Sequence, residues 1–211
     1  MPAYAAHPLK SALLLRALGE GDIIEDNMEV DEMKRIAIDM DDVMADFSAK
    51  YTRLFNEKFD LDLTKEQLAR EDVRHLHKKF MDEIMIRLED PTFFRDLEVM
   101  ADSQEVIKAL SEHYEIFIAT AAMEVPASFN AKFEWLKEHF PFLEQMNIVF
   151  CGDKSVIHAD YLIDDNTKNF KGFKGEGILF SAPHNMDETH EPRVSTWQEI
   201  RHYLLADQVK A

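Results

Sequence analysis

Short apolar runs alternate along the chain with stretches in which apolar residues recur at helical spacing. The apolar runs are typical of buried strands, and they span residues 36–38, 114–119, 146–151, 159–163 and 177–180. The stretches with helical spacing are 47–59, 103–113, 129–140 and 197–205. Strands that alternate with helices in this way predict an α/β fold, a doubly wound parallel sheet with helices on both faces.

Further helices are predicted between the first strand and the next strand–helix unit. Thr64 is a plausible N-cap, and Gln67 three residues later completes a capping box. A longer helical stretch runs from Val73 to Leu88. We therefore expect a small helical cap at residues 50–95, inserted after the first strand. The segments left to form the core around the sheet are 33–49 and 96–211.

Residues 1–32 differ from the rest of the chain. A short amphipathic stretch at Leu9–Leu18 is followed by an acidic, mostly polar tract. The stretch does not resemble a secretory signal, because its apolar part is short and Arg16 interrupts it. We expect the folded domain to begin at Met33, and residues 1–32 to be a flexible N-terminal extension or the product of an upstream start.

Composition and charge narrow the classes of partner. The 211 residues include 24 Lys and Arg against 41 Asp and Glu, a formal net charge of −17. Nucleic-acid polymers and anionic membranes need a positive footprint, so both are excluded as expected partners. Cys151 is the single cysteine, and no apolar run approaches the ~20 residues of a membrane span. We expect a cytoplasmic protein that acts on a small molecule and could form a homodimer.

Reactive side chains lie at the predicted carboxyl ends of the strands. Asp39 and Asp41 follow the first strand and, on an extended backbone, would face the same side. Open parallel sheets bind ligands at this edge, so we expect the groups at the strand ends to converge. The residues in these positions are Asp39, Asp41, Thr120, Lys154, Asp164 and Asp165.

A convergent set of this kind suits a metal ion and a phosphate group. Magnesium prefers carboxylate oxygens and keeps places for water and phosphate. Phosphoryl transfer depends mainly on positioning and charge stabilisation, and a carboxylate can serve as its nucleophile. Taken alone, the residues leave a second interpretation open, in which Asp39 and Asp41 belong to a solvated acidic turn and Lys154 to an exposed loop.

The order and spacing of these residues resemble the four motifs of the haloacid-dehalogenase (HAD) phosphohydrolase superfamily, which has a Rossmann-like core. Signalling receiver domains also gather aspartates, Thr and Lys, but there the acidic pair comes first and the Lys last. The order in this chain, in which Asp164 and Asp165 follow Lys154, argues against that family. The resemblance extends, over residues 33 to about 203, to the 5′(3′)-deoxyribonucleotidase family (cytosolic or mitochondrial 5′-nucleotidase type C). The segments that carry this closer resemblance are Ala45–Phe47, Phe93–Glu98, Gly152–Val156, Tyr161–Asp165, Ile178–Phe180 and His184–Asn185.

The resemblance implies roles for the two catalytic carboxylates and for the substrate contacts. Asp39 would be the nucleophile that becomes an aspartyl-phosphate, and Asp41 the general acid and base. The phosphate would be held by Thr120, Ala121 and Lys154, and the nucleoside by Phe47 and Phe93. Mg²⁺ would be bound at Asp39, Asp41, Asp164 and Asp165, with Asp165 as a direct ligand and Asp41 binding through its backbone carbonyl.

The implied function is a Mg²⁺-dependent phosphatase that converts nucleoside monophosphates, deoxynucleotides among them, to nucleoside and phosphate. Two residues depart from the family pattern: Asp42 stands where glycine is usual, and Ala121 where serine is common. Asp42 lacks the backbone freedom of glycine, and Ala121 lacks a phosphate donor. The alternatives are a phosphatase for another small phosphate ester and a non-catalytic protein that binds phosphate or nucleotides.

Overall fold

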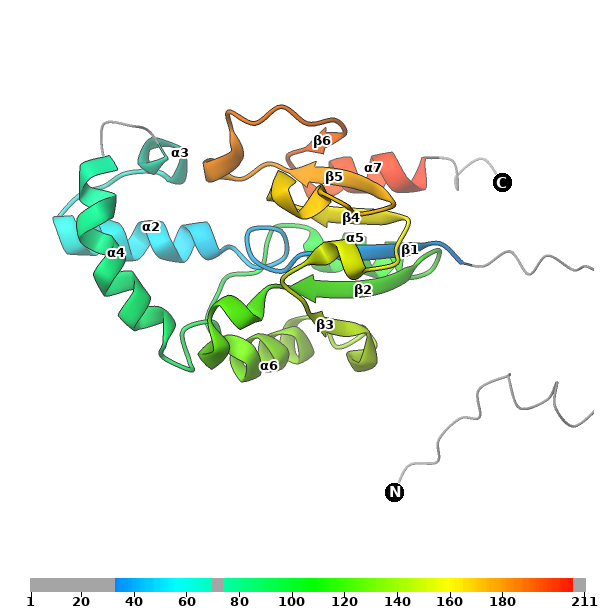
Figure 1. Ribbon diagram of the computed structural model, residues 1–211, viewed down its shortest axis with the longest axis horizontal. Coiled ribbons are helices and arrows are strands. Elements are labelled where there is room, and N and C mark those ends of the chain that lie inside the picture. The colour runs from blue at the N-terminus through cyan, green and yellow to red at the C-terminus, as the bar shows by residue number, and fades with distance from the viewer. Residues whose placement is uncertain (1–32, 70–73, 207–211) are drawn as a thin grey trace, which may run out of the picture. The chain divides into compact units, whose positions relative to one another are not determined.

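Six parallel strands form one sheet in the computed structural model, which describes residues 33–69 and 74–206 (Figure 1). The strands lie in the order β3-β2-β1-β4-β5-β6. Strand β1 is central, between β2 and β4, at the point where the strand order reverses and where sheets of this type bind ligands. The strands are β1 (Arg35–Ile38), β2 (Glu115–Thr120), β3 (Ile148–Phe150), β4 (Tyr161–Asp164), β5 (Glu176–Phe180) and β6 (Arg193–Val194).

Three helices follow β1 and lie beyond the carboxyl ends of the strands (Figure 1). They are α2 (Phe47–Phe59), α3 (Lys65–Leu68) and α4 (Arg74–Leu88). The capping box at the start of α3 is confirmed: the Thr64 hydroxyl accepts from the Gln67 N–H over 3.2 Å, and the Gln67 side chain accepts from the Thr64 N–H over 2.8 Å. The cap at 50–95 stays a prediction, and its first boundary falls inside α2. The predicted extension at 1–32 lies outside the described residues.

The two faces of the sheet are covered differently. Ile36 and Ile38 of β1 belong to one large buried cluster with residues of three helices, α5 (Ser103–Leu110), α6 (Phe129–His139) and α7 (Trp197–Leu205). A smaller cluster contains Ala37 of β1. It is covered by residues that belong to, or directly follow, two short 3₁₀ helices, η7 (Lys154–Val156) and η8 (Thr167–Phe170). The predicted parallel sheet flanked by helices is therefore confirmed, although short helices serve one of the faces.

The five strands predicted from apolar runs are confirmed, each within two residues of its predicted ends. The two-residue strand β6 was not predicted. The helix predicted at 103–113 ends at Leu110, where the chain turns toward β2. Among residues 33–69 and 74–206, no helix combines the length and apolar character needed to cross a membrane.

Two buried indole groups fix the segments that leave and re-enter the core. The Trp197 Nε1–H donates to the Val43 carbonyl over 2.8 Å, next to the end of β1. The Trp135 Nε1–H donates to the Leu97 carbonyl over 2.9 Å, on the return from α4. Both tryptophans are almost completely buried. Helices α6 and α7 therefore hold the backbone on each side of the inserted helices.

We expect Trp197→Phe to lower the free energy of unfolding by about 1–3 kcal/mol, because the buried Val43 carbonyl loses its donor. Urea unfolding would measure the change. Tyr203→Phe is the matched control on α7, since the Tyr203 hydroxyl bonds to Glu176 at the surface, and its expected effect is within about 0.5 kcal/mol. Equal urea midpoints for the two variants would show that the indole hydrogen bond contributes nothing to the free energy of unfolding.

Candidate active site

The loop after β1 brings Asp39 and Asp41 to one cavity. Backbone pairing with β4 continues past the end of β1, because the Asp39 N–H donates to the Ile163 carbonyl over 2.9 Å. The chain then turns back tightly, and the Asp42 N–H donates to the Ala45 carbonyl over 2.7 Å. The prediction that Asp39 and Asp41 face the same side assumed that the strand continues through Asp41. It does not, because β1 ends at Ile38. Both carboxylates nevertheless line a cavity of about 380 Å³.

Lys154 lies behind this cavity and joins two strand ends. Its ammonium group donates to the carboxylates of Asp39 and Asp164, and its side chain is completely buried. Burial by itself lowers the pKa of Lys154, but the two carboxylates outweigh burial and raise that pKa above its ordinary value. The interpretation of Lys154 as an exposed loop lysine is therefore wrong.

The carboxylate of Asp164 is fully engaged by protein donors. Besides Lys154, it accepts from the Asn166 N–H over 2.9 Å and from the Asn169 amide over 2.9 and 3.0 Å. Burial, with the nearby charge of Asp39, raises the pKa of Asp164 to about 6, although Lys154 opposes the rise. Asp164 is completely buried and does not line the cavity.

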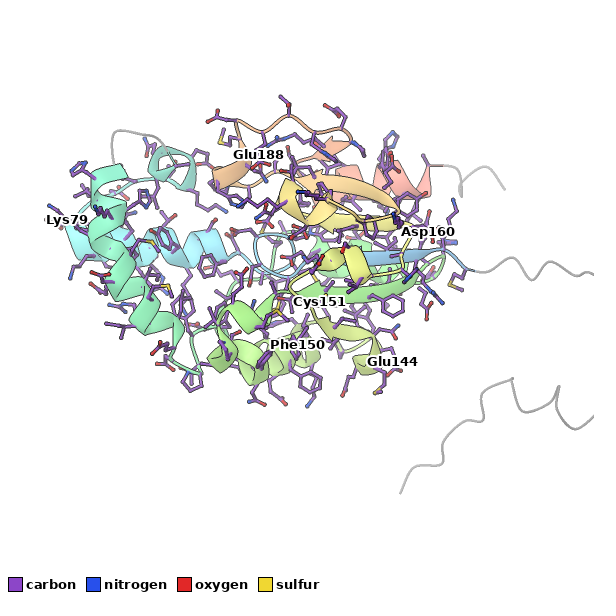
Figure 2. The ribbon with its side chains drawn as sticks, viewed as in Figure 1. Lys79, Glu144, Phe150, Cys151, Asp160 and Glu188 are labelled. Carbon is purple, nitrogen blue, oxygen red and sulfur yellow. The ribbon has the colours of Figure 1, made fainter. Side chains whose placement is uncertain are left out.

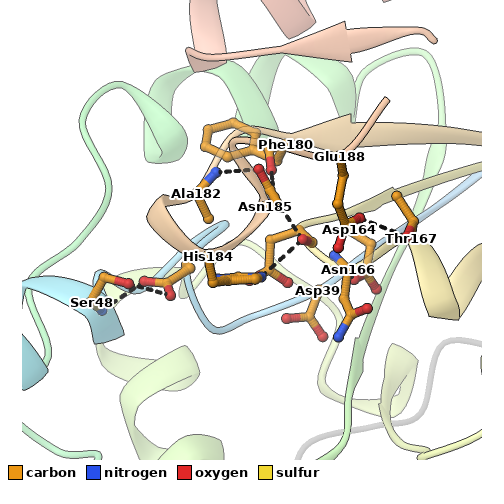
Figure 3. Close-up of polar contacts among 12 residues, drawn as sticks. Asp39, Ser48, Asp164, Asn166, Thr167, Phe180, Ala182, His184, Asn185 and Glu188 are labelled. Carbon is orange, nitrogen blue, oxygen red and sulfur yellow. Dashed lines mark hydrogen bonds and ion pairs between the residues drawn. The ribbon is translucent and has the colours of Figure 1, made fainter. Parts of the chain in front are cut away.

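Asp165, by contrast, lines the cavity. Its backbone carbonyl accepts from the Asn185 amide over 2.7 Å and from His184 Nε2 over 3.1 Å, contacts that fix the loop after β4 (Figure 3). Burial, followed by repulsion from Asp39 and Asp164, raises the pKa of Asp165 well above its ordinary value. One ligand atom from each of Asp42, Asp165 and His184 lies within 4.8 Å of the others.

Asp42, the residue where glycine is usual in the family, adopts the left-handed backbone conformation with φ of 55°. Its two carboxylate oxygens accept from the Ser48 N–H over 2.7 Å and from the Ser48 hydroxyl over 2.6 Å. Burial raises the pKa of Asp42 to about 6, although these hydrogen bonds oppose it. The side chain thus binds the first turn of α2.

Lys132 of α6 is a site residue that the sequence analysis missed. Its ammonium group donates to Asp41 Oδ2 and, over 3.1 Å, to the Thr120 hydroxyl. Burial raises the pKa of Asp41, and Lys132 opposes that rise. One signal was present in the sequence: Lys132 lies within the apolar stripe of its helix, buried beside Trp135 and Leu136.

Thr120, at the end of β2, is buried and lies behind the cavity rather than on its wall. The next residue, Ala121, does line the cavity. Strand β3 ends alongside, where the N–H of Cys151, labelled in Figure 2, donates to the Thr120 carbonyl over 2.9 Å. The ends of β2 and β3 therefore stay paired at the level of the site.

Aromatic rings form a second wall. Phe47 and Phe94 both line the cavity, with stacked rings whose centroids are 6.2 Å apart. Phe93, which the sequence analysis placed against the nucleoside, does not line the cavity. Its ring lies 4.0 Å from the Lys50 ammonium group, which also donates to the Phe93 carbonyl and to Asp96. Phe93 therefore packs beside α2, and Phe94 is the one of the two rings that lines the cavity.

The donor set fits a hard divalent cation. Asp39 and Asp165 present carboxylates to the same cavity, and their loops are held by independent hydrogen bonds. Burial first, and then the charge of Asp39, raise the pKa of Asp164 and that of Asp165. Oxygen ligands with unmet negative charge are those that Mg²⁺ prefers.

The chain resembles one enzyme family over most of its length. The family model described as "5′ nucleotidase, deoxy (Pyrimidine), cytosolic type C protein" matches residues 33–210. A relative from Staphylococcus epidermidis is 48% identical, over 81% of this chain and 96% of the relative. The 5′(3′)-deoxyribonucleotidase of Bacillus subtilis is 41% identical, over 82% of this chain and 99% of that enzyme.

Solved structures support the fold. A HAD family hydrolase from Deinococcus radiodurans, solved with phosphate and sodium, aligns with a TM-score of 0.56 at 12% identity, over 84% of this chain and 97% of that chain. YfnB from Bacillus subtilis, solved with magnesium, aligns with a TM-score of 0.50 at 16% identity, over 82% and 98%. This chain therefore belongs to the cytosolic type C 5′-nucleotidase family, which includes 5′(3′)-deoxyribonucleotidases, and is a phosphomonoesterase with a HAD-like fold.

Proposed function

We propose that the protein hydrolyses nucleoside monophosphates, deoxynucleotides above all, through a phosphoryl group held covalently on Asp39. The position of Asp39 is the observation that carries this proposal. Its Oδ1 accepts from the buried Lys154, while Oδ2 receives no hydrogen bond from residues 33–69 or 74–206. One oxygen is thus anchored, and the other is available to attack a phosphorus atom in the cavity.

In the first step, the free Asp39 oxygen forms a bond to phosphorus as the bond from phosphorus to the nucleoside oxygen breaks. The leaving oxygen takes a proton from the carboxyl group of Asp41. Burial favours the protonated form of Asp41, because it raises the pKa of this group. The products of this step are the nucleoside and an aspartyl-phosphate.

In the second step, water attacks the same phosphorus atom. Asp41, now ionised, accepts a proton from the water as the Asp39–phosphorus bond breaks and Asp39 returns as a carboxylate. Lys154 stays between Asp39 and Asp164 in both steps and offsets the negative charge that accumulates. Ala121, at the end of β2, lines the cavity that would hold the phosphate, and Thr120 lies directly behind it.

Mg²⁺ is the cofactor in this proposal. The Asp39 carboxylate, the Asp41 backbone carbonyl and the Asp165 carboxylate would hold it, and Asp164 would orient the site through its hydrogen bonds. Bound Mg²⁺ would supply positive charge to the phosphate oxygens.

The nucleoside would lie against Phe47 and Phe94, on the cavity wall that faces α2 and α4. Residues 50–95 form the cap of this proposal, and residues 33–49 and 96–211 its core. The net charge of −17 favours a small phosphate ester over a nucleic-acid polymer. The cytoplasm is the proposed location.

Asp39→Asn is expected to lower kcat for deoxynucleoside monophosphates by about a thousandfold or more, because the amide is a poor nucleophile. Phosphate release in the presence of Mg²⁺ would measure the loss. The thermal midpoint should stay close to that of the wild type, since Lys154 retains Asp164 as a partner. A folded variant with near-wild-type turnover would disprove covalent catalysis by Asp39.

Asp165→Asn is expected to raise the Mg²⁺ concentration needed for half-maximal thermal stabilisation by roughly 10–100-fold, because a charged ligand is lost. Asp187→Asn, at an exposed position after η9 (Pro183–Asn185), is the matched control and should not change that concentration. EDTA should abolish phosphate release by the wild type. If Asp165→Asn responds to Mg²⁺ as the wild type does, Asp165 is not a ligand.

Phe94→Leu is expected to raise KM for deoxynucleotides by about three- to tenfold, because the base loses an aromatic surface. Phe93→Leu is the matched comparison, and it should lower thermal stability while changing KM less than about threefold. Initial-rate kinetics would measure KM for deoxynucleotides in both variants. A KM increase confined to Phe93→Leu would assign the nucleoside contact to Phe93.

A further inference from the structure

We infer that Lys50 is a positioning residue, which holds Phe94 in place against the nucleoside without touching the substrate itself. The inference rests on the proposed function, in which the nucleoside lies against Phe94. Lys50 belongs to the first turn of α2 and does not line the cavity. It acts on the turn that follows α4, where the chain returns to the core.

Lys50 binds this returning turn at three points. Its ammonium group donates to the Phe93 carbonyl and to the carboxylate of Asp96, and it lies 4.0 Å from the centroid of the Phe93 ring. The Lys50 side chain is only 11% exposed, although that of Asp96 is 67% exposed. No other hydrogen bond joins α2 to residues 93–96, all of which the structure describes. Lys50 is therefore the polar link between α2 and this turn.

The hydrogen bond to the Phe93 carbonyl acts directly on Phe94. That carbonyl belongs to the planar peptide group that joins the two residues, so fixing it restricts the backbone dihedral angles on each side. The Phe93 ring is held beside the Lys50 ammonium group, and the plane of the Phe94 ring lies at 69° to it, with centroids 5.2 Å apart. Because Phe93 is held in this way, the side chain of Phe94 is directed to the cavity, which it lines.

Helix α2 holds both aromatic residues from one face. Phe47 and Lys50 are three residues apart, a spacing that makes side chains neighbours on a helix surface. Phe47 stacks on Phe94 with an angle of 20° between the rings, and Lys50 holds Phe93. Lys132 also lies 4.8 Å from the Phe94 ring centroid, but it contacts the ring rather than the backbone. Without Lys50, the peptide group that directs Phe94 would lose its link to α2.

The effect of Lys50 should be confined to the part of the substrate that Phe94 contacts. A less ordered Phe94 ring would bind the base more weakly, whereas the sugar, the phosphate and the reacting atoms would keep their contacts. A contact that is equally strong in the ground state and in the transition state changes KM and leaves kcat unchanged. Loss of Lys50 should therefore raise KM for nucleotides only.

The test compares thymidine 5′-monophosphate with 2-deoxyribose 5-phosphate, which keeps the sugar and the phosphate but lacks the base. Initial rates in the presence of Mg²⁺ would give KM and kcat for both esters. Lys50→Met keeps an unbranched apolar stem without the ammonium group, and Lys50→Arg keeps the positive charge and the donors. Lys58→Met is the matched control, because Lys58 lies on the same helix and pairs with Glu83 over 2.7 Å, and neither residue lines the cavity.

For Lys50→Met, we expect KM for thymidine 5′-monophosphate to rise about three- to tenfold, the range expected when the Phe94 ring itself is removed. KM for 2-deoxyribose 5-phosphate and kcat for both esters should change less than about twofold, because only binding of the base is weakened. Lys50→Arg should recover part of the loss, and Lys58→Met should match the wild type on both esters.

A double-mutant cycle would separate positioning of Phe94 from a general loss of stability. If Lys50 acts through Phe94, Lys50→Met should raise KM for the nucleotide by less than about twofold in a Phe94→Leu background, because the ring that it positions is already absent. If the two residues act independently, the increases in KM would multiply.

The inference would be overturned by an unchanged KM in Lys50→Met, by an equal rise on both esters, or by full multiplication of the two effects. If Lys50→Met does not fold, as judged by circular dichroism, Lys50→Gln provides the same comparison, because its neutral side chain forms neither the ion pair nor the cation–π contact. Failure of the proposed function would give a different result, because the wild type would then hydrolyse thymidine 5′-monophosphate no better than 2-deoxyribose 5-phosphate, or not at all.

Discussion

The buried contact of Lys154 with Asp39 and Asp164 is the interaction on which the geometry of the site depends. Strands β1 and β4 are neighbours, so the carboxylates at their ends meet where little water enters. Breaking a buried ion pair by removing one partner costs about 3–5 kcal/mol, because the remaining charge is left uncompensated. One ammonium group compensates two carboxylates here. Adjacent strands can therefore both end in aspartates, and the carboxylate of Asp39 keeps a fixed direction.

Lysine side chains compensate the carboxylates of the site only in part. The carboxylates outnumber the ammonium groups of Lys132 and Lys154, and burial raises the pKa of several of them. A dianionic phosphate would add further negative charge to the cavity. A divalent cation relieves both problems at once, because it brings two positive charges to oxygen ligands that already lie together. In the proposed reaction, the metal and the substrate would therefore favour each other's binding.

The sheet and most of the carboxylates could be predicted from the sequence because their signals are local. A buried run that ends in Asp39 identifies a strand and its reactive end, and parallel strands end at one edge. Lys132 could not be placed in this way, since only tertiary packing aims a helical lysine at a loop from a different part of the chain. The sequence also could not tell which of Phe93 and Phe94 lines the cavity, because both lie in a turn, where no period sets the direction of neighbouring side chains.

Asp42 shows how a departure from a family pattern can be accommodated. The sequence alone suggested that loss of glycine would remove backbone freedom, and the left-handed conformation does cost an ordinary residue about 1–2 kcal/mol. The structure offsets this cost, because the carboxylate accepts two hydrogen bonds from Ser48 at the start of α2, and bonds to charged groups are worth about 1.5–3 kcal/mol each. Glycine could not make these bonds. The substitution therefore replaces backbone freedom with a link between the catalytic loop and the first helix after it, at the price of one more negative charge beside Asp165.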